Sequence, residues 1–403
     1  MVGDRTHSRL PVRRFTPGNR ITLLRNGTEY FPALEQAIAG AQEDIYLECY
    51  IFAADPTGLR IAAALRAAAA RGVAVHVMVD GWGAKNFLSP YLIDSLKTGG
   101  VQFAKYRPEV APWQFRTRRL RRLHRKLVSV DHKIAFVGGI NVIDDMNTPG
   151  HTPPRLDFAV RVEGPVAGAV VQTMKHLWAL IRFAQMKESG DGLFPPAPPT
   201  VRAGDQTAKL VIRDNLRNRR EIEQAYLTAI HTARSEILIA NAYFLPGVRF
   251  RRALVAAAER GVHVTLLLQG RVEYVLLHYA SRALYGQLLQ AGVEIHEHHQ
   301  SFLHAKVAVI DQRWATVGSS NIDPFSLLMS REANIVVRNV AFAEELRREI
   351  RRIMTRGGKR LAPDDWKNRS PLHKAAVWAA YGFVRFMMGV LGYGAEDRLH
   401  IGE

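Results

Sequence analysis

His304-Ala-Lys306-Val-Ala-Val-Ile-Asp311 begins a pattern that ends at Gly318-Ser319-Ser320-Asn321 and that occurs twice in the chain. The earlier copy reads His124-Arg-Lys126-Leu-Val-Ser-Val-Asp131 and ends at Gly138-Gly139-Ile140-Asn141. In both copies a lysine lies two positions after the histidine, and an aspartate five positions after the lysine. A glycine then follows seven positions later and an asparagine three positions after that. These matching spacings predict two related units that contribute to one site.

The spacing indicates which motif residues act together. Side chains alternate between the two faces of a β-strand, so His304 and Lys306 lie on the same face. Asp311 lies an odd number of positions from His304 and about 16 Å from Lys306, at ~3.3 Å per residue. We therefore expect the aspartate to end the strand or form a turn, and to support the catalytic set from there. The same reasoning applies to His124, Lys126 and Asp131.

The residue types of the two motifs suit chemistry on a phosphate diester. A lysine offers a compact positive charge and an asparagine an amide donor to the non-bridging oxygens, which gain charge in the transition state. A neutral histidine can attack phosphorus while a protonated one gives its proton to the departing alkoxide. No compact set of carboxylates or thiols accompanies the motifs, so no metal site is predicted. The expected phosphate-holding residues are Lys126, Lys306, Asn141 and Asn321.

This double His-Lys-Asp pattern resembles that of the phospholipase D superfamily, from about residue 20 to 350. The resemblance implies two similar α/β halves that form one active site, a covalent phosphohistidine, and neither metal nor other cofactor. Gly138-Gly139-Ile140-Asn141, Asp144-Asp145 and Asp157-Phe-Ala-Val-Arg-Val-Glu-Gly are most similar to bacterial cardiolipin synthases of the B type. These lack an N-terminal membrane hairpin. By the same resemblance, His124 is the nucleophile and His304 the general acid.

Acids downstream of each motif are candidates for orienting the histidines. Asp157 follows His124 by 33 positions, and Glu332 follows His304 by 28. In the family an acid at about this distance accepts a hydrogen bond from the reactive imidazole and raises its basicity. The alternative for Glu332 is a surface ion pair with Arg331. Glu48 is a further candidate, for the site or for a structural role.

Strand-like and helix-like segments alternate in both halves, which favours sheets with helices on their faces. The first half contains expected strands at 21–25, 45–52 and 73–80 and helices at 30–41 and 59–71. The second contains helices at 221–233 and 249–260 and strands at 236–244 and 262–268. We predict an α/β protein of two phospholipase D-like αβα sandwich domains related by a pseudo-twofold, each with a mixed β-sheet flanked by helices.

A chain of 403 residues is longer than one hydrophobic core usually supports, so two domains are expected. The predicted divisions are a basic N-terminal segment (1–20), a first domain (21–193), a Pro-rich linker (194–205), a second domain (206–358) and a C-terminal amphipathic membrane-associating segment (359–403).

Charge and cysteine content restrict the environment. The net charge of +18 and pI near 10.2 imply a polyanionic partner, either nucleic acid or an anionic membrane. Cys49 is the only cysteine, which excludes an internal disulfide and favours a packed side chain over a reactive thiol. The first twenty residues contain no apolar stretch of signal-peptide length, so export by such a signal is not expected.

Two other clusters have competing interpretations. An arginine run before His124 either gathers anionic headgroups or forms a solvated face, and Trp113 and Phe115 beside it either insert at a lipid interface or pack in the core. The run comprises Arg116, Arg118, Arg119, Arg121, Arg122 and Arg125. His296, His298 and His299 lack a matching thiol and have Glu294 and Glu297 nearby, which argues against zinc.

Residues 371–391 are apolar except for Lys374, Tyr381 and Arg385, which fall on one helical stripe. Two basic residues would be costly at the centre of a bilayer, so an interfacial helix is favoured over a membrane span. The alternative is a C-terminal helix packed on the protein.

The resemblance to cardiolipin synthases implies transfer of a phosphatidyl group between two phosphatidylglycerols through a phosphohistidine, with release of glycerol. Phosphatidylethanolamine is an alternative substrate. The expected partner is an anionic phospholipid membrane, at the cytoplasmic face of the bacterial inner membrane, where the protein is peripheral. No nucleic acid and no obligate protein partner are expected. The alternative functions are a phospholipase D that releases phosphatidic acid and a phospholipase D-family nuclease, which would use the same residues.

Overall fold

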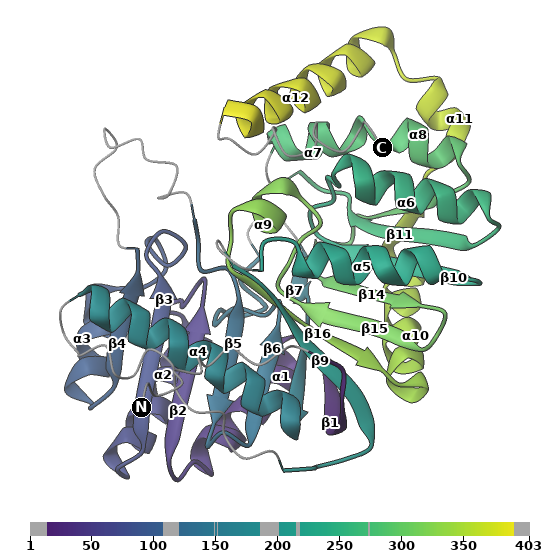
Figure 1. Cartoon of the computed structure of the whole chain (residues 1–403). Coiled ribbons are helices and arrows are strands. Elements are labelled where there is room, and N and C mark those ends of the chain that lie inside the picture. The colour runs from purple at the N-terminus through teal and green to yellow at the C-terminus, as the bar shows by residue number, and fades with distance from the viewer. Residues whose placement is uncertain are drawn as a thin grey trace, which may run out of the picture.

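Two sheets with the same strand order join edge to edge in this protein. The computed structural model describes residues 14–107, 121–148, 150, 152–185, 201–214, 218–272 and 275–390. Within them, strands from both halves form one 15-stranded mixed sheet, flanked by helices on its two faces (Figure 1). The α/β architecture predicted from the sequence is confirmed. The continuity of the sheet across both halves was not predicted.

The first half consists of strands β1 to β8 and helices α1 to α4. Its strands are β1 (Thr16–Arg25), β2 (Asp44–Cys49), β3 (Ala74–Asp80), β4 (Gln102–Tyr106), β5 (Lys126–Val130), β6 (Ile134–Gly138), β7 (Thr152–Leu156) and β8 (Phe158–Glu163). Its helices are α1 (Asn26–Ala39), α2 (Pro56–Ala70), α3 (Pro90–Thr98) and α4 (Pro165–Ala184).

The second half contains the remaining strands and helices. Its strands are β9 (Gln206–Arg213), β10 (Glu236–Asn241), β11 (His263–Gln269), β12 (Glu294–His298), β13 (Ser301–Leu303), β14 (Lys306–Ile310), β15 (Trp314–Gly318), β16 (Glu332–Arg338) and β17 (Gly358–Arg360). Its helices are α5 (Glu221–Thr232), α6 (Val248–Glu259), α7 (Val275–Arg282), α8 (Tyr285–Gln290), α9 (Pro324–Leu328), α10 (Val340–Gly357), α11 (Pro363–Lys367) and α12 (Pro371–Val390).

The order of the strands shows that the two halves are repeats. The first half runs β1-β8-β6-β5-β2-β3-β4, and the second runs β9-β16-β15-β14-β10-β11-β12 with β17 added at the edge. β1 pairs with β9 at the junction. β1 begins at Thr16, so this strand includes residues that the sequence assigned to the basic N-terminal segment. The predicted linker lies largely outside the described residues.

Local sequence accounts for the principal elements. α2, α3 and α10 begin after Asp55, Ser89 and Asn339, whose side chains accept hydrogen bonds from the first turn of each helix. Such caps contribute about 1 kcal/mol each. β5 and β14 are buried on both faces, which explains their nearly continuous apolar sequences.

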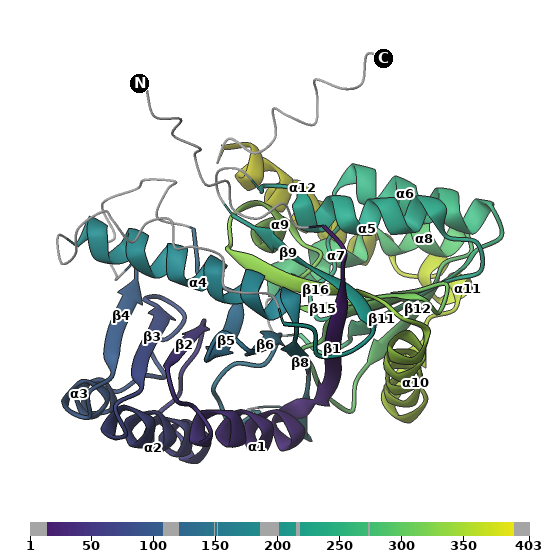
Figure 2. The ribbon, with the colours of Figure 1, turned by 60° about the horizontal axis from the view of Figure 1, so that its bottom comes forward.

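Helices cover both faces of the sheet. In the first half, α1, α2 and α3 lie on one face and α4 on the other (Figure 2). On the α4 face, a single apolar cluster contains residues of both halves, including Val162 and Met174 from the first and Val337 and Leu346 from the second. This shared core holds the halves in a fixed relationship.

A second connection joins the halves beside the motifs. β7 of the first half and β13 of the second form a parallel two-stranded sheet, in which Leu156 pairs with Leu303. The next residues along the chain are Asp157 and His304. Leu123 likewise forms a bridge with Arg331, one position before His124 and Glu332. These pairings bring each motif to the opposite half.

α12 has one packed face and one exposed face. Val377, Val384 and Met388 are buried, and Val384 and Met388 belong to the second-half core, where α12 lies against α7. Of the three residues predicted to lie on one stripe, Lys374 and Tyr381 are partly buried and Arg385 is exposed. Among the described helices, none is long and apolar enough to cross a bilayer.

Candidate active site

The two motif histidines lie immediately before β5 and β14, each bonded to backbone of the opposite half. The backbone N–H of His124 donates to the carbonyl of Arg331 at 3.0 Å, and that of His304 donates to the carbonyl of Leu156 at 2.8 Å. The acceptor in each case is the residue before a predicted orienting acid. The pseudo-twofold relationship therefore extends to the backbone of the site.

Each imidazole is paired with the acid of the other half. Nδ1 of His124 lies 2.8 Å from Oε1 of Glu332, and Nδ1 of His304 lies 2.5 Å from Oδ2 of Asp157. Both acids are buried, which excludes the surface ion pair considered for Glu332. An ionised carboxylate only accepts hydrogen bonds, so Nδ1 of each ring donates and Nε2 is left available. The sequence identified the two acids but not their exchange between halves.

The two acids are held in different ways. The second oxygen of Glu332 accepts a hydrogen bond from Ser319 at 2.5 Å, whereas that of Asp157 accepts from the backbone N–H of Phe158 at 2.8 Å. Gly139 occupies the position equivalent to Ser319, and a Cβ there would lie 2.2 Å from Asp157. Glycine is thus required where the carboxylate approaches the backbone closely.

The two lysines are buried beneath the histidines. Lys126 donates to the carbonyl of His124 at 2.6 Å, and Lys306 makes the equivalent bond to His304. Burial lowers the pKa of Lys126 to about 8 and that of Lys306 to about 7, although Glu332 and Asp157 act in the opposite direction. A bound anion would stabilise the charged form of both buried lysines.

Burial also lowers the pKa of both histidines. It is the largest cause at His124 and at His304, where Lys306 adds to it and brings the pKa to about 3. Burial alone would raise the pKa of Asp157, but Lys306 and His304 outweigh it and lower that pKa. The lowered pKa values favour neutral imidazoles and an ionised Asp157 in the resting site. A bound phosphate anion would raise the histidine pKa values and favour protonation of one ring.

The two asparagines lie at equivalent positions and are buried. Oδ1 of Asn141 accepts from the backbone N–H of Ile51 at 3.1 Å, which leaves the amide N–H groups as donors for other partners. Tyr50, which the sequence analysis did not identify, also lies in the site. Its ring is 4.9 Å from that of His124 and 5.5 Å from Nζ of Lys126. The sequence signal that could have identified Tyr50 was its position at the end of β2, close to the candidate residue Glu48.

Comparison with known proteins decides the family. A profile described as "Cardiolipin synthase, PLD-like domain" matches residues 34–176 and 226–354, the two repeated halves. Cardiolipin synthase B of Escherichia coli (strain K12) is 37% identical over 93% of this chain and 90% of its own length. This chain belongs to the cardiolipin synthase family. It is thus a phosphatidyltransferase-type enzyme of the phospholipase D superfamily.

More distant relatives agree with that membership. Cardiolipin synthase A of Proteus mirabilis (strain HI4320) is 28% identical over 91% of this chain and 75% of its own length. The crystal structure of phosphatidylserine synthase from Haemophilus influenzae Rd KW20 superimposes with a TM-score of 0.69 and covers 96% of this chain and 98% of its own, at 12% identity. At that identity the likeness concerns the fold.

The motif aspartates lie at the far ends of the strands. Asp131 and Asp311 have positive φ of 50° and 49° and begin the tight turns after β5 and β14. Asp131 accepts backbone N–H groups of residues 42–44, and Asp311 accepts those of residues 234–236. They fix the turns to the starts of β2 and β10 and do not meet the histidines. This arrangement supports the expected turn role rather than a chemical one in this cardiolipin synthase relative.

Glu48 and Arg125 form a buried pair away from the imidazoles. Arg125 donates to Glu48 at 2.5 and 2.9 Å, and both side chains are almost fully buried. The suggestion that Arg125 gathers headgroups was wrong, because its guanidinium is enclosed beneath the sheet edge. Ala305 and Ala240 stand at the equivalent positions of the second half, so the pair belongs to the first half only.

Aromatic and basic side chains gather at the same sheet edge as the histidines. Trp82, just after β3, is 57% exposed, and its ring is approached by Arg122 at 5.4 Å and Lys85 at 5.9 Å. Arg116, Arg118, Arg119, Trp113 and Phe115, which the sequence singled out, lie outside the described residues.

The histidine cluster of β12 does not form a metal site in the described part of the chain, where no suitable group of three His, Cys, Asp or Glu occurs. His296 and His299 instead lie 3.7 Å and 3.4 Å from Glu294 and Glu297. His298 is buried and bonded to Ser301.

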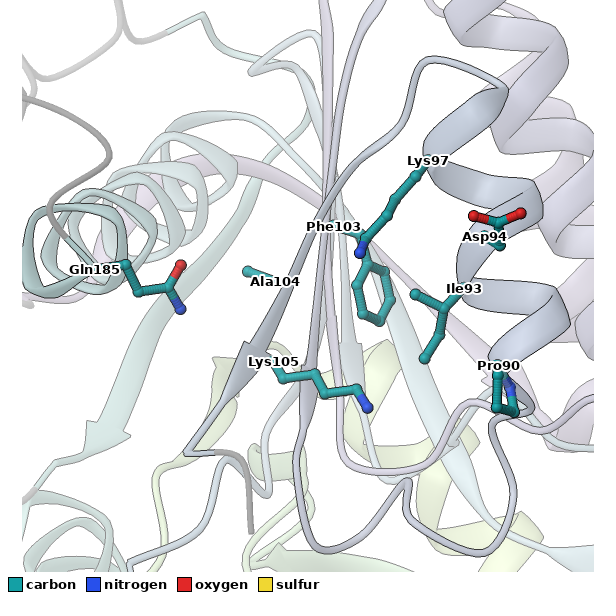
Figure 3. Close-up of a pocket in the computed structure, with 8 residues that line it drawn as sticks. All are labelled: Pro90, Ile93, Asp94, Lys97, Phe103, Ala104, Lys105 and Gln185. Carbon is teal, nitrogen blue, oxygen red and sulfur yellow. The ribbon is translucent and has the colours of Figure 1, made fainter. Parts of the chain in front are cut away.

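A hollow of about 380 Å³ between α3 and β4 lies apart from both motifs. Figure 3 shows Lys97 and Ile93 of α3 beside Phe103, with Gln185 on the other side of the view. It contains neither a histidine nor a phosphate-binding asparagine. The hollow therefore has no part in the chemistry of the site.

Proposed function

We propose that this enzyme transfers a phosphatidyl group from one phosphatidylglycerol to the hydroxyl of a second, and so forms cardiolipin and glycerol. The observation that carries the proposal is the exchanged pairing of His124 with Glu332 and His304 with Asp157. In this arrangement Nε2 of each imidazole is available, and the two buried lysines lie beneath the rings. This arrangement suits double displacement at phosphorus, in which one ring becomes phosphorylated and the other transfers protons.

In the first step Nε2 of His124 attacks the phosphorus of the donor lipid. A nitrogen–phosphorus bond forms, the bond from phosphorus to the glycerol oxygen breaks, and His304 gives its proton to that oxygen. The product is phosphatidyl-His124 and free glycerol. Glu332 stabilises the positive imidazole by accepting from Nδ1, as a buried carboxylate does beside a reacting histidine.

In the second step the neutral His304 takes the proton of an acceptor hydroxyl, which attacks phosphorus. The new oxygen–phosphorus bond replaces the bond to His124, and both histidines return to their starting states. One diester is exchanged for another, so no nucleotide is required. General acid and base assistance of this kind is worth about 10² to 10⁴ in rate.

The lysines and asparagines stabilise the charge of the phosphoryl oxygens. Lys126 and Lys306 have lowered pKa values because they are buried, and an anion relieves the repulsion between them. Asn141 and Asn321 supply amide donors from the loops after β6 and β15. Preorganised donors of this kind act without reorganisation during the reaction.

The membrane-facing surface, in this proposal, is the sheet edge that contains the histidines. The end of β10 pairs with Lys306 at the start of β14, so β10 ends at the catalytic edge. β11 is parallel to β10 and ends at the same edge, and α7 follows β11 in the chain. α12 packs on α7 and exposes Trp378, Phe383 and Phe386. Trp82 lies at the equivalent edge of the first half. Exposed aromatic rings beside basic groups are typical of lipid interfaces.

Hydrolysis to phosphatidic acid and cleavage of DNA are the competing activities, because the same residues would catalyse them. The apolar outer face of α12 favours lipid over DNA. We propose a peripheral location on the cytoplasmic face of the bacterial inner membrane, with phosphatidylglycerol as donor and acceptor and phosphatidylethanolamine as an alternative substrate.

Mass spectrometry of products from phosphatidylglycerol vesicles tests the activity. Cardiolipin and glycerol in equal amounts, lost in His124→Ala and in His304→Ala, are the expected result. Phosphatidic acid alone would make the protein a hydrolase. No lipid product, together with cleavage of single-stranded DNA, would replace the proposal by a nuclease function.

A further inference from the structure

A large hollow lies at the opposite edge of the second-half sheet from the histidines. It has a volume of about 980 Å³ and is bounded by α5, the start of β1 and the ends of β14 to β16. Lys306 begins β14 at the catalytic edge, and Ile310 at the other end of that strand lines the hollow. The hollow is therefore separate from the phosphate site. Its volume is that of a pocket for an organic ligand.

Four basic side chains line this hollow: Lys209, Arg234, Arg313 and Arg338. Within the described part of the chain, none of the four forms an ion pair with a carboxylate. Phe15 lies between two of them, with its ring 3.7 Å from the Arg338 guanidinium and 4.9 Å from Nζ of Lys209. Two cations thus share one aromatic ring and are held close together.

Two carboxylates, those of Asp311 and Glu221, also line the hollow. Asp311 lines the hollow, but its oxygens already accept backbone N–H groups of Arg234, Ser235 and Glu236. Glu221 also lines the hollow and raises the pKa of Lys209. Burial and Arg338 outweigh that effect, so the pKa is lowered. Two acids thus line the hollow beside four cations, and burial is the largest cause of the lowered pKa of Lys209.

The first half provides an internal comparison. Trp314 pairs with Arg338 in the second half, and Ile134 pairs with Glu163 at the same place in the first. The equivalents of Lys209, Arg234, Ser235 and Arg338 are Thr22, Gln42, Glu43 and Glu163.

In the first half, the two acids Glu163 and Glu43 pair with nearby basic groups. Glu163 lies 3.0 Å from Arg161, and Glu43 lies 3.8 Å from Lys133, the equivalent of Arg313. The second half has lost both acids and gained three cations on the same framework. The fold alone does not demand this charge, because the first half forms without it.

We propose that this hollow binds a water-soluble organic anion that contains phosphate groups. Arginine guanidinium groups bind phosphate oxygens through paired hydrogen bonds, and lysine adds a point charge. Trp314, Ile310 and Val340 provide an apolar wall for the rest of the ligand. The hollow opens at the edge away from the proposed membrane surface, which favours a soluble ligand over a lipid headgroup. Only this last step rests on the proposed function.

Isothermal titration calorimetry of the full chain tests the proposal with three probes: ADP, pyrophosphate and dihexanoylphosphatidylglycerol below its micelle concentration. We expect saturable binding of ADP and pyrophosphate. Arg338→Glu, which restores the charge of Glu163, should weaken both by at least about tenfold, as loss of a charge-assisted contact does. Phosphatidyl transfer measured without these ligands should stay within about twofold of the original protein, because Arg338 lies outside the site.

Two matched variants locate the bound ligand. Lys306→Met should retain ADP binding, whereas Lys209→Met should weaken it. Equal ADP binding by the original protein and by Arg338→Glu would exclude the hollow as the binding site. Loss of ADP binding in Lys306→Met would assign the anion to the catalytic site. Either result would overturn the proposal. Binding of the lipid probe alone, or of no probe, would also overturn it. None of these results depends on which reaction the histidines catalyse.

Discussion

Nδ1 of His304 lies 2.5 Å from Oδ2 of Asp157, a residue 147 positions earlier in the chain. The same exchange pairs His124 with Glu332. Neither motif histidine is paired with an acid of its own half, so the reactive imidazoles are oriented only when the halves are joined. The shared core and the β7–β13 pairing therefore support catalysis as well as stability.

Removing either acid should disable the histidine of the opposite half. In Asp157→Asn the amide cannot stabilise a positive His304, and we expect kcat to fall by about 10² or more while KM changes little. Glu332→Gln should have a similar effect through His124.

Imidazole NMR distinguishes this exchange from a general loss of structure. Asp157→Asn should shift the titration of His304 and leave that of His124 nearly unchanged, and Glu332→Gln should do the reverse. A variant that perturbs the histidine of its own half instead would contradict the exchanged pairing.

The buried lysines predict how activity depends on pH. Lys306 and Lys126 have pKa values lowered to about 7 and about 8, so each is charged below that value and loses its charge as the pH rises through it. We expect kcat/KM for a soluble phosphodiester to fall above pH ~7 to 8. Lys306→Arg keeps its charge and should move this decline to higher pH, even if its maximum is lower. An unmoved decline would exclude Lys306 as its cause.

The turn aspartate should matter for stability and not for chemistry. Backbone N–H groups lower the pKa of Asp311 although burial opposes them, so its contribution is present at neutral pH and is lost as the pH falls through its folded pKa. Asp311→Asn should reduce the free energy of unfolding in urea at pH 7 by about 1 to 3 kcal/mol.

Asp131→Asn is the matched change in the first half and should likewise reduce the free energy of unfolding at pH 7. The kcat of the folded variants should stay within about twofold of the original, because both side chains lie about 16 Å from the lysines at ~3.3 Å per residue. A large loss of kcat with unchanged stability would restore a chemical role for the aspartates.

The outer face of α12 should bind vesicles. Trp378→Ser combined with Phe386→Ser removes two exposed rings, and we expect weaker sedimentation with phosphatidylglycerol vesicles but unchanged turnover of a soluble diester. Deletion of the whole segment is a poorer test, because Val384 and Met388 belong to the second-half core.

Val384→Ala is the control on the inner face of the same helix. It should lower stability and leave vesicle binding intact. Equal vesicle binding by the double variant and the original protein would exclude α12 as the membrane contact.

The alternation of strand-like and helix-like segments predicted the α/β class, and the fixed spacing of the repeated motif indicated the candidate site residues. His124, Lys126 and their second-half equivalents lie together, since residues two apart share a strand face. The exchange of Asp157 and Glu332 could not be predicted, because sequence distance suggests an acid of the same half. Two pairings between segments far apart in the chain determine the exchange: β7 with β13 beside Asp157 and His304, and Leu123 with Arg331 beside His124 and Glu332.

Charge patterns were the least predictable feature. Arg125 appeared within a run of arginines, yet its side chain is buried because Glu48 provides a bidentate partner across β2 and β5. Lys374, Tyr381 and Arg385 were predicted to lie on one stripe, yet the first two are partly buried and only Arg385 is exposed. Burial of such groups depends on a neighbour that local sequence does not reveal.

The most direct test is to trap the covalent intermediate. The protein is mixed with phosphatidylglycerol that contains a ³²P-labelled phosphate, quenched in alkali, which preserves phosphohistidine, and digested for mass spectrometry. We predict a phosphorylated His124 in the original protein and no labelled histidine in His124→Ala. Addition of glycerol or of unlabelled phosphatidylglycerol should remove the label from His124. Cardiolipin formation without any labelled histidine, or undiminished labelling elsewhere in His124→Ala, would contradict the account.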